Sequence, residues 1–517
     1  MKKISTLFFA AILSLNLMAS DLVIIKTENF NDVRILFESE NLKIHFFRDD
    51  FVIATAEKSY IPNSIIIDEN AWSVDASYYI AYVNTEEHKN AYKDEVNNRA
   101  EILFDGDYFL VIKTDEIKYG QLPPSKNDGM VGLFDIAAKL PEIHPFFKSY
   151  SISDPDAFIL ELMDEVDGSL ITANVQHMQY YVTRNAYSPQ SVEAQIWLQQ
   201  EFEFLGLDVE VMDFSMPNGP ASDNVIATLV GTTYPEEYVV LGAHYDSISR
   251  NGDAPGADDN ASGTAAVLEI ARILSQYDFE RSIIFCAFSG EEYGLFGSKA
   301  YANRCAQQGM NILGYFNLDM IGYLKPGNTT VKSSLIYPGS AAPLADFYTN
   351  ITSVYLPDFV VTPASFSGGD SDHTAFNING YMGIFPFEDI NNYSPYIHTY
   401  NDIVGLSYNN ENQAVIFTQA VLASVVTMAV IGESVIGINE PMYHSRIFPN
   451  PSNGNLSIVL NDDKNVRIII SDMSGRVVYN SIAAGNIVID VSGLKSGLYI
   501  LSIENDTLKE SHKIVVL

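Results

Sequence analysis

Hydrophobic and polar positions change their spacing twice along the 517-residue chain, which divides it into three regions. Residues 21 to about 165 alternate short apolar runs, such as LKIHFF and YFLVIKT, with acidic turns, and this pattern predicts short strands. From about 166 to 436, apolar runs of strand length alternate with segments of helical period. Residues 447–517 return to short alternating runs separated by Gly or Asn turns, which predicts a small β-sandwich.

The middle region has the pattern of an α/β domain. YVVLGAHYDS, SIIFCAFSG and ILGYFNLDMIGY are apolar runs, and GTAAVLEIARILSQY and GSKAYANRCA lie between them with helical spacing. In the first helical segment one face carries Val267, Ile270, Ala271 and Leu274, which suits packing on a sheet. We therefore predict an α/β fold with a mixed, largely parallel sheet sandwiched by helices. A β-rich or α+β domain of residues 21–165 precedes it, and a linker of residues 437–446 leads to the β-sandwich.

The N-terminus, MKKISTLFFAAILSLNLMAS, has two lysines, a short apolar core and small residues where a signal peptidase would cut. Residues 1–20 are therefore predicted to be a signal peptide, which implies export. A second uncharged stretch, residues 414–432, is long enough to cross a membrane. Because it contains Thr418, Gln419 and Ser424, we expect a buried core helix and no stable membrane span.

Charge and cysteine content narrow the class of protein further. Sixty-five acidic residues against 30 basic ones give a net charge of −35. This balance excludes nucleic acid and anionic membranes as expected partners, because both are bound through basic patches. Of the two cysteines, Cys286 lies in the predicted strand SIIFCAF, where a free thiol commonly acts as a small core residue. Pairing with Cys305 stays open.

Acidic and imidazole side chains gather where the predicted strands end. His244 and Asp246 follow the run EYVVLGA, at the edge where α/β sheets bind ligands. Asp258 and Asp259 stand just before a helix, where they could bind metal or cap that helix. Two divalent metals sharing a carboxylate need about five ligands and an unliganded base. The candidates are His244, Asp258, Glu292, Asp319, His398 and Glu291.

Six motifs occur in order: HYDS, PGADDNASG, SGEEYGLFGS, NLDMIG, SDHTAF and HTYNDI. Together they resemble the co-catalytic dizinc aminopeptidase family, which includes bacterial leucyl aminopeptidases. Glutamate carboxypeptidases, glutaminyl cyclases and the transferrin receptor are more distant members. The resemblance covers about residues 170–435 and implies the zinc exopeptidase fold with two Zn²⁺ ions per chain.

The resemblance also implies a role for each matching residue. Asp258 would bridge the two zinc ions. His244 and Asp319 would bind one ion, and Glu292 and His398 the other. Glu291 would be the general base, and Asp246 would orient His244. Asp259 would shape the loop through an unusual Asp258–Asp259 bond and could meet the substrate amine.

These roles imply hydrolysis of an N-terminal peptide bond. Met320 and Phe366 are candidates for an apolar substrate pocket, so an apolar N-terminal residue is the expected preference. Some relatives carry an oxyanion-stabilising tyrosine where this chain has Gly368, so zinc or another donor would take that task. His373 is expected to be a structural group in a first helical turn.

Other functions stay open at this point. A glutaminyl cyclase would use a similar ligand set with one zinc ion. A carboxypeptidase or dipeptidase would need to recognise the substrate carboxylate, for which the motifs offer no arginine cluster. A binding protein without activity would be expected to have lost ligands or the base.

The C-terminal region resembles a second family. FPNPSNGN, ISDMSGRVVYN, VSGLKSGLYILSI and KIVVL are similar to the C-terminal sorting domain of the type IX secretion pathway. This resemblance implies passage through the periplasm to the cell surface or the medium, with the secretion machinery as a partner. The role of residues 21–165 stays open between a pro-domain removed on maturation and a permanent wall of the substrate cleft.

Overall fold

The computed structural model describes residues 20–56, 63–72, 76–83, 85–97, 99–114, 129–133, 135–150, 152–217, 219, 221–365, 369–429, 445–448, 452, 454–459, 465–472, 476–485, 487–505 and 509–516. Residues 1–19 of the predicted signal peptide, residues 437–444 of the predicted linker, Phe366 and Gly368 lie outside them. The chain divides into two compact units, residues 1–433 and 434–517.

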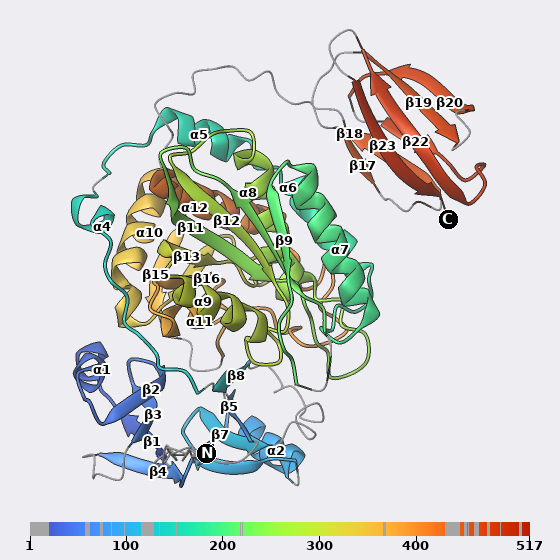
Figure 1. The fold of residues 1–517 in the computed structure, drawn as a ribbon. Coiled ribbons are helices and arrows are strands. Elements are labelled where there is room, and N and C mark those ends of the chain that lie inside the picture. The colour runs from blue at the N-terminus through green and yellow to red at the C-terminus, as the bar shows by residue number, and fades with distance from the viewer. Residues whose placement is uncertain are drawn as a thin grey trace, which may run out of the picture. The chain divides into compact units, whose positions relative to one another are not determined.

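The N-terminal part of the first unit contains two four-stranded antiparallel sheets (Figure 1). The first has the order β2-β3-β1-β4 and consists of β1 (Asp21–Lys26), β2 (Leu42–Phe47), β3 (Phe51–Ala56) and β4 (Ser64–Asp68). The second has the order β6-β7-β5-β8 and consists of β5 (Ser77–Tyr82), β6 (Glu101–Asp105), β7 (Phe109–Thr114) and β8 (Met130–Leu133). Two helices accompany them, α1 (Phe30–Phe37) and α2 (Glu86–Val96).

The rest of this unit is built around a mixed eight-stranded sheet, in the order β15-β14-β16-β13-β11-β12-β10-β9. Its strands are β9 (Asp208–Met212), β10 (Asn224–Leu229), β11 (Tyr234–His244), β12 (Arg281–Phe288), β13 (Asn311–Asn317), β14 (Lys332–Ile336), β15 (Val360–Ala364) and β16 (Gly383–Phe387). Four central strands pair in parallel, at β12–β11, β11–β13 and β13–β16. Antiparallel pairs occur on both sides of it, at β10–β12 and β14–β16.

Helices cover both faces of this sheet (Figure 1). Successive residues of a strand point to opposite faces, so Val239 and Leu241 pack on one side and Val240 on the other. The Val239 side is covered by α5 (Ala157–Asp164), α6 (Gly168–Gln179), α7 (Pro189–Phe204), α8 (Gly263–Leu274), α10 (Ala342–Tyr355) and α12 (Glu411–Ala429). The Val240 side is covered by α9 (Phe296–Gln308) and α11 (His373–Ile378). The predicted sandwiched α/β fold is confirmed.

Two details bear on the predicted boundaries and spans. Ile159, Leu162 and Met163 of α5 pack in the core of the eight-stranded sheet, so this helix lies with the middle region, although the predicted boundary follows it at residue 165. Helix α4 (Phe146–Ser149) precedes it. Helix α12 is long and apolar enough to cross a membrane, but 72% of its apolar window is buried inside the protein, as in a core helix. Cys286 and Cys305 are free thiols buried in one apolar cluster.

The described residues of the second unit form seven strands in two antiparallel sheets. One sheet has the order β17-β18-β21 and the other β20-β19-β22-β23. They consist of β17 (Arg446–Phe448), β18 (Asn455–Val459), β19 (Val466–Asp472), β20 (Val477–Ala483), β21 (Ile487–Asp490), β22 (Gly497–Glu504) and β23 (Lys509–Val516). Alternate residues of both sheets meet in one apolar core, as in the β-sandwich expected from the sequence.

Candidate metal centre

The carboxyl ends of three adjacent parallel strands carry the candidate ligands. His244 is the last residue of β11, Glu291 and Glu292 follow β12, and Asp319 stands two residues after β13. Because parallel strands end at one edge of the sheet, these side chains converge. His398 reaches the same place from the loop between β16 and α12, with a left-handed backbone (φ of 53°). Non-glycine residues in that conformation are often held there at functional sites.

The fifth element of the site is an irregular turn, Ala257–Ser262, before α8. The carboxylate of Asp402 accepts hydrogen bonds from the backbone N–H groups of Asp258 and Asp259, at 2.8 and 3.0 Å. The turn also lies very close to the end of β13, because a Cβ at Gly263 would stand 2.0 Å from the carbonyl oxygen of Leu318. Glycine at residue 263 therefore allows the turn to approach the loop that carries Asp319.

A buried arginine holds the segment that leads into this turn. Arg184 is fully buried and donates to the carbonyl oxygens of Tyr245, Pro255 and Gly256 at 2.6 to 2.7 Å. Burial lowers the pKa of Arg184 to about 10, so its guanidinium stays charged at neutral pH. Neither Arg184 nor Asp402 was predicted from the sequence, because each acts on a loop far from it along the chain.

Asp259 lies between the two imidazoles. Its Oδ1 is 3.4 Å from Nε2 of His244, and its Oδ2 is 3.2 Å from Nε2 of His398. Two ligands of a tetrahedral zinc ion, each about 2.0–2.1 Å from it, lie about 3.3 Å apart. Asp259 therefore presents one oxygen to each of two positions suited to a divalent cation.

Asp258, predicted as the bridging ligand, does not join this group. Its Oδ1 accepts a hydrogen bond from the N–H of Gly322 at 2.8 Å, and its Oδ2 is buried without a hydrogen-bond partner. Of the two candidate metal groups among the described residues, one contains Asp259 and neither contains Asp258. The cis peptide bond is Asp259–Asn260, whereas the sequence analysis expected the unusual bond between Asp258 and Asp259.

The structure brings the other predicted ligands close together. Oε2 of Glu292 is 2.9 Å from Nε2 of His398, and Oδ1 of Asp319 is 3.5 Å from Nε2 of His244. The predicted base Glu291 points at the same space, with its Oε2 3.9 Å from His244 Nε2. The ligand atoms of His244, Glu291 and Asp319 lie within 4.8 Å of one another, as do those of His244, Asp259 and Glu292.

Asp246 supports both sides of the site. Its backbone carbonyl oxygen is 3.1 Å from Nδ1 of His244, whereas its carboxylate is 3.5 Å away. The carboxylate instead accepts the N–H groups of Glu291 and Glu292, at 3.2 and 3.4 Å. Asp246 therefore orients the imidazole through its main chain and the two glutamates through its side chain.

Asp319 is held from its outer side. Its Oδ2 accepts a hydrogen bond from the hydroxyl of Ser371 at 2.6 Å, and Ser371 in turn accepts one from Asn317 Nδ2 at 2.8 Å. Its Oδ1, which faces His244, is buried and has no hydrogen-bond partner. Neither Ser371 nor Asn317 was among the predicted site residues, although they are the first residues of the motifs SDHTAF and NLDMIG, respectively.

The electrostatics of the site fit divalent cations. Burial acts to lower the pKa of His244, but the charges of Glu291 and Asp319 raise it well above its usual value. Burial is the main cause that raises the pKa of Glu292, to about 7, and the charge of Asp259 adds to it. Burial likewise raises the pKa of Glu291 well above its ordinary range. Without metal, protons have to offset this buried acidity; two divalent cations bound to the same atoms would replace them.

An apolar cluster lies beside the candidate ligands. The cavity in front of them is also lined by Met320, Phe385, Phe387 and Ile397. Met320, Phe385 and Phe387 are buried in one apolar cluster with Ile336. Met320, a candidate for the substrate pocket, lines this cavity, and Phe366 lies outside the described residues. His373 begins α11, is buried and lies 3.9 Å from Asp370, and neither candidate metal group among the described residues contains it.

Two regions of the chain match known protein families. Residues 224–423 match peptidase family M28, and residues 446–517 match the secretion system C-terminal sorting domain. The chain contains a peptidase family M28 domain. A probable zinc metalloprotease of Pyrenophora tritici-repentis is 30% identical over 254 residues, 44% of this chain and 56% of that protein. A probable leucine aminopeptidase of Trichophyton verrucosum is 31% identical over 242 residues, 43% of this chain and 62% of that protein.

The M28 domain has the same fold as a solved bacterial aminopeptidase. The LapA aminopeptidase of Legionella pneumophila aligns with a TM-score of 0.56 at 19% identity, over 69% of this chain and 99% of that chain. The chain spans about half the length of the first curated relatives it matches. The match therefore assigns a domain and a fold.

Proposed function

We propose that this protein is a secreted dizinc aminopeptidase that removes N-terminal residues, preferably apolar ones, from peptides. The observation that carries this proposal is the position of Asp259, which offers one oxygen toward His244 and the other toward His398. His244 and Asp319 would hold one zinc ion, His398 and Glu292 the other, and Asp259 would bridge them. The relatives of this chain include proteins named as leucine aminopeptidases, which supports the same activity.

The residues around this centre suit amide hydrolysis. Zinc bound there would lower the pKa of a bound water and polarise the scissile carbonyl. Glu291, held through its N–H by Asp246, would take the proton of the attacking water and deliver it to the leaving amine. Met320, Phe385 and Phe387 would receive the side chain of the N-terminal residue. Gly368 lies outside the described residues, so no replacement for the oxyanion-stabilising tyrosine is assigned.

A panel of peptides tests the activity and its alternatives. Purified protein is incubated with aminoacyl, N-blocked and N-glutaminyl peptides, as isolated, after chelation and after zinc is restored. We expect release of N-terminal leucine from free peptides, no cleavage of N-blocked ones, loss of activity on chelation and recovery with about two zinc ions per chain. Cyclisation of the glutaminyl peptide without cleavage would instead indicate a glutaminyl cyclase, and release of the C-terminal residue a carboxypeptidase.

The sorting domain gives a second prediction. If residues 446–517 direct export, a chain that ends before residue 446 should fold, because the peptidase region forms a separate compact unit. We expect that chain to be active but retained in the periplasm of the native host, while the full-length protein reaches the cell surface or the medium. Fractionation followed by an aminopeptidase assay measures this. Unchanged appearance outside the cell would contradict the proposed role.

A further inference from the structure

The N-terminal sheets contact the peptidase region at the loop that follows Glu291 and Glu292. In β8, the N–H of Gly132 donates to the carbonyl oxygen of Gly294 at 3.2 Å, and the carbonyl oxygen of Gly132 accepts a hydrogen bond from the ammonium group of Lys299. The N–H of Gly294 donates in turn to the carbonyl oxygen of Glu291 at 2.8 Å. Gly129, which directly precedes β8, lines the metal cavity itself.

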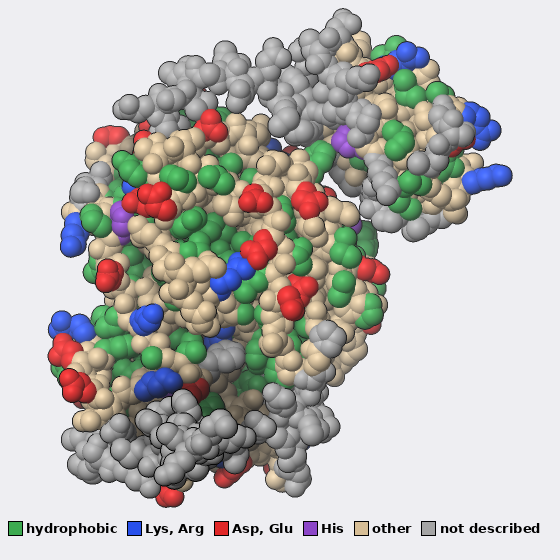
Figure 2. Space-filling model, viewed as in Figure 1, with side chains coloured by type: hydrophobic (Ala, Val, Ile, Leu, Met, Phe, Trp, Pro, Cys, Tyr) green, Lys and Arg blue, Asp and Glu red, His purple; other side chains and the backbone are tan. Residues whose placement is uncertain are grey.

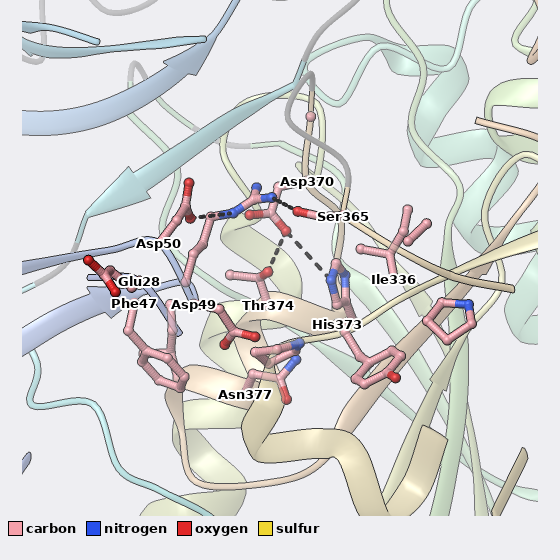
Figure 3. Close-up of a pocket in the computed structure, with 17 residues that line it drawn as sticks. Glu28, Phe47, Asp49, Asp50, Ile336, Ser365, Asp370, His373, Thr374 and Asn377 are labelled. Carbon is pink, nitrogen blue, oxygen red and sulfur yellow. Dashed lines mark hydrogen bonds and ion pairs between the residues drawn. The ribbon is translucent and has the colours of Figure 1, made fainter. Parts of the chain in front are cut away.

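A second contact reaches the loop beside Asp319. The hydroxyl of Tyr82, at the end of β5, donates to Oδ2 of Asp370 at 3.0 Å. The guanidinium of Arg48 lies over the ring of Tyr82, 5.6 Å from its centroid, and donates to its hydroxyl oxygen at 3.4 Å. Oδ1 of Asp370 accepts hydrogen bonds from the N–H of Ser371 and the hydroxyl of Thr374. Figure 3 shows Asp370 and Thr374 joined in this way, in a cavity that Phe47, Asp49 and Asp50 of the N-terminal region also line.

These bonds form a continuous path to a proposed zinc ligand. Tyr82 holds the side chain of Asp370, and Asp370 fixes the main chain of Ser371. The hydroxyl of Ser371 donates to Asp319 at 2.6 Å. Hydrogen-bond partners behind a metal ligand set its orientation and affect metal affinity. The N–H of Gly339 also donates to the carboxylate of Asp49, at 3.0 Å to its nearer oxygen.

The apolar core continues across the same boundary. Leu295 and Ile378 are buried in the cluster formed by the N-terminal strands β1, β2 and β3. Phe296, at the start of α9, is buried with residues of β5 and β7 and with Tyr92 and Val96 of α2. Removing the N-terminal sheets would expose these side chains to water and take a hydrogen-bond partner from Lys299 and from Asp370.

We propose that the N-terminal region is a permanent part of the working enzyme and that Tyr82 is a positioning residue, acting through Asp370 and Ser371 on the Asp319 ligand. This inference rests on the proposed dizinc function of the site. It assigns the described N-terminal strands and helices, β1 to β8 with α1 and α2, to the wall of the substrate cleft and not to a pro-domain that is removed on maturation. The Arg48 guanidinium is part of the same arrangement, because it supports the hydroxyl of Tyr82.

Zinc affinity of full-length variants tests the positioning role. Tyr82→Phe is compared with Tyr78→Phe, which removes a similarly buried hydroxyl from the same strand. The hydroxyl of Tyr78 donates to Asp68 at 2.6 Å, within the N-terminal region. Loss of a partner directly behind a ligand typically costs 10–100-fold in affinity, so a more distant group is expected to cost about threefold to tenfold. Tyr82→Phe should therefore lose zinc affinity by about that factor, measured in competition with a chelator. Its kcat on an aminoacyl peptide should fall by a similar factor, with less change in KM. Tyr78→Phe should match the parent in all three quantities.

Equal zinc affinity of Tyr82→Phe and Tyr78→Phe would overturn the positioning role. If the parent binds two zinc ions but cleaves no peptide, the proposed function fails, and the zinc comparison still decides the role of Tyr82.

The intact mass of the active exported enzyme tests whether the N-terminal region is a permanent wall of the cleft. A fully active form that begins after residue 133 would reject it, and a form that begins near residue 20 is expected.

Discussion

Replacing Glu291 with Gln is expected to lower kcat by about 10² to 10⁴, the usual contribution of a positioned acid or base, while the protein keeps both zinc ions. Gln has the same shape and can still hydrogen-bond a water, but it cannot accept the proton of that water. The N–H of residue 291 would still donate to Asp246, so the turn should keep its place. Zinc content by atomic absorption and kcat on an aminoacyl peptide measure the two properties separately.

Glu292→Gln is the matched comparison, because it makes the same chemical change at the next residue. Glu292 faces His398 at 2.9 Å and is proposed as a ligand, so its replacement should weaken zinc binding at one position. We expect excess zinc to restore part of the activity of Glu292→Gln and none of that of Glu291→Gln. A Glu291→Gln protein that has lost metal, or that works at the parental rate, would show that the two roles are reversed.

The fold could be predicted where the spacing of apolar residues is compatible with only one type of secondary structure. The segment that begins at Gly263 has four apolar residues on one helical face, and α8 occupies Gly263–Leu274. His244 ends a long apolar run, and β11 ends at that residue. Because parallel strands end at one edge, the positions of His244, Glu291, Glu292 and Asp319 along the sequence were enough to predict that they meet.

The choice between Asp258 and Asp259 could not be made from spacing. The two residues are adjacent, and both lie in a turn whose backbone is not helical at Asp259, with φ of −109° and ψ of 94°. Which carboxylate faces the histidines depends on that local path and on Asp402, which is 143 residues further along the chain and holds both N–H groups. The residue types were recognised correctly, but the direction of each side chain is a property of the folded turn.

The supporting residues were hidden for a different reason. Ser371, Arg184 and Tyr82 belong to common residue types, and each makes a bond that joins distant parts of the chain. The bond spans 52 residues from Ser371 to Asp319, 61 from Arg184 to Tyr245 and 288 from Tyr82 to Asp370. Their role depends on burial and on hydrogen bonds formed after folding. The polar residues between the two parts of the first unit, such as Tyr82 and Asp370, carry no periodic signal. A sequence pattern can therefore indicate which strand ends and loops carry candidate ligands, but the groups that orient them appear only in three dimensions.

The pair Asp259→Asn and Asp258→Asn should separate the two adjacent aspartates most clearly. Asp259 is proposed to bind both ions, and an amide is a poor substitute for a shared carboxylate. Since loss of a supporting group alone costs 10–100-fold, we expect Asp259→Asn to lose more than about 100-fold in zinc affinity and nearly all activity. In Asp258→Asn the side-chain oxygen can still accept from the N–H of Gly322, so near-parental zinc content and activity are expected. Both variants keep the N–H groups bound by Asp402, and circular dichroism checks that both fold. Loss of zinc in Asp258→Asn with retention in Asp259→Asn would return the bridging role to Asp258, as the sequence first implied.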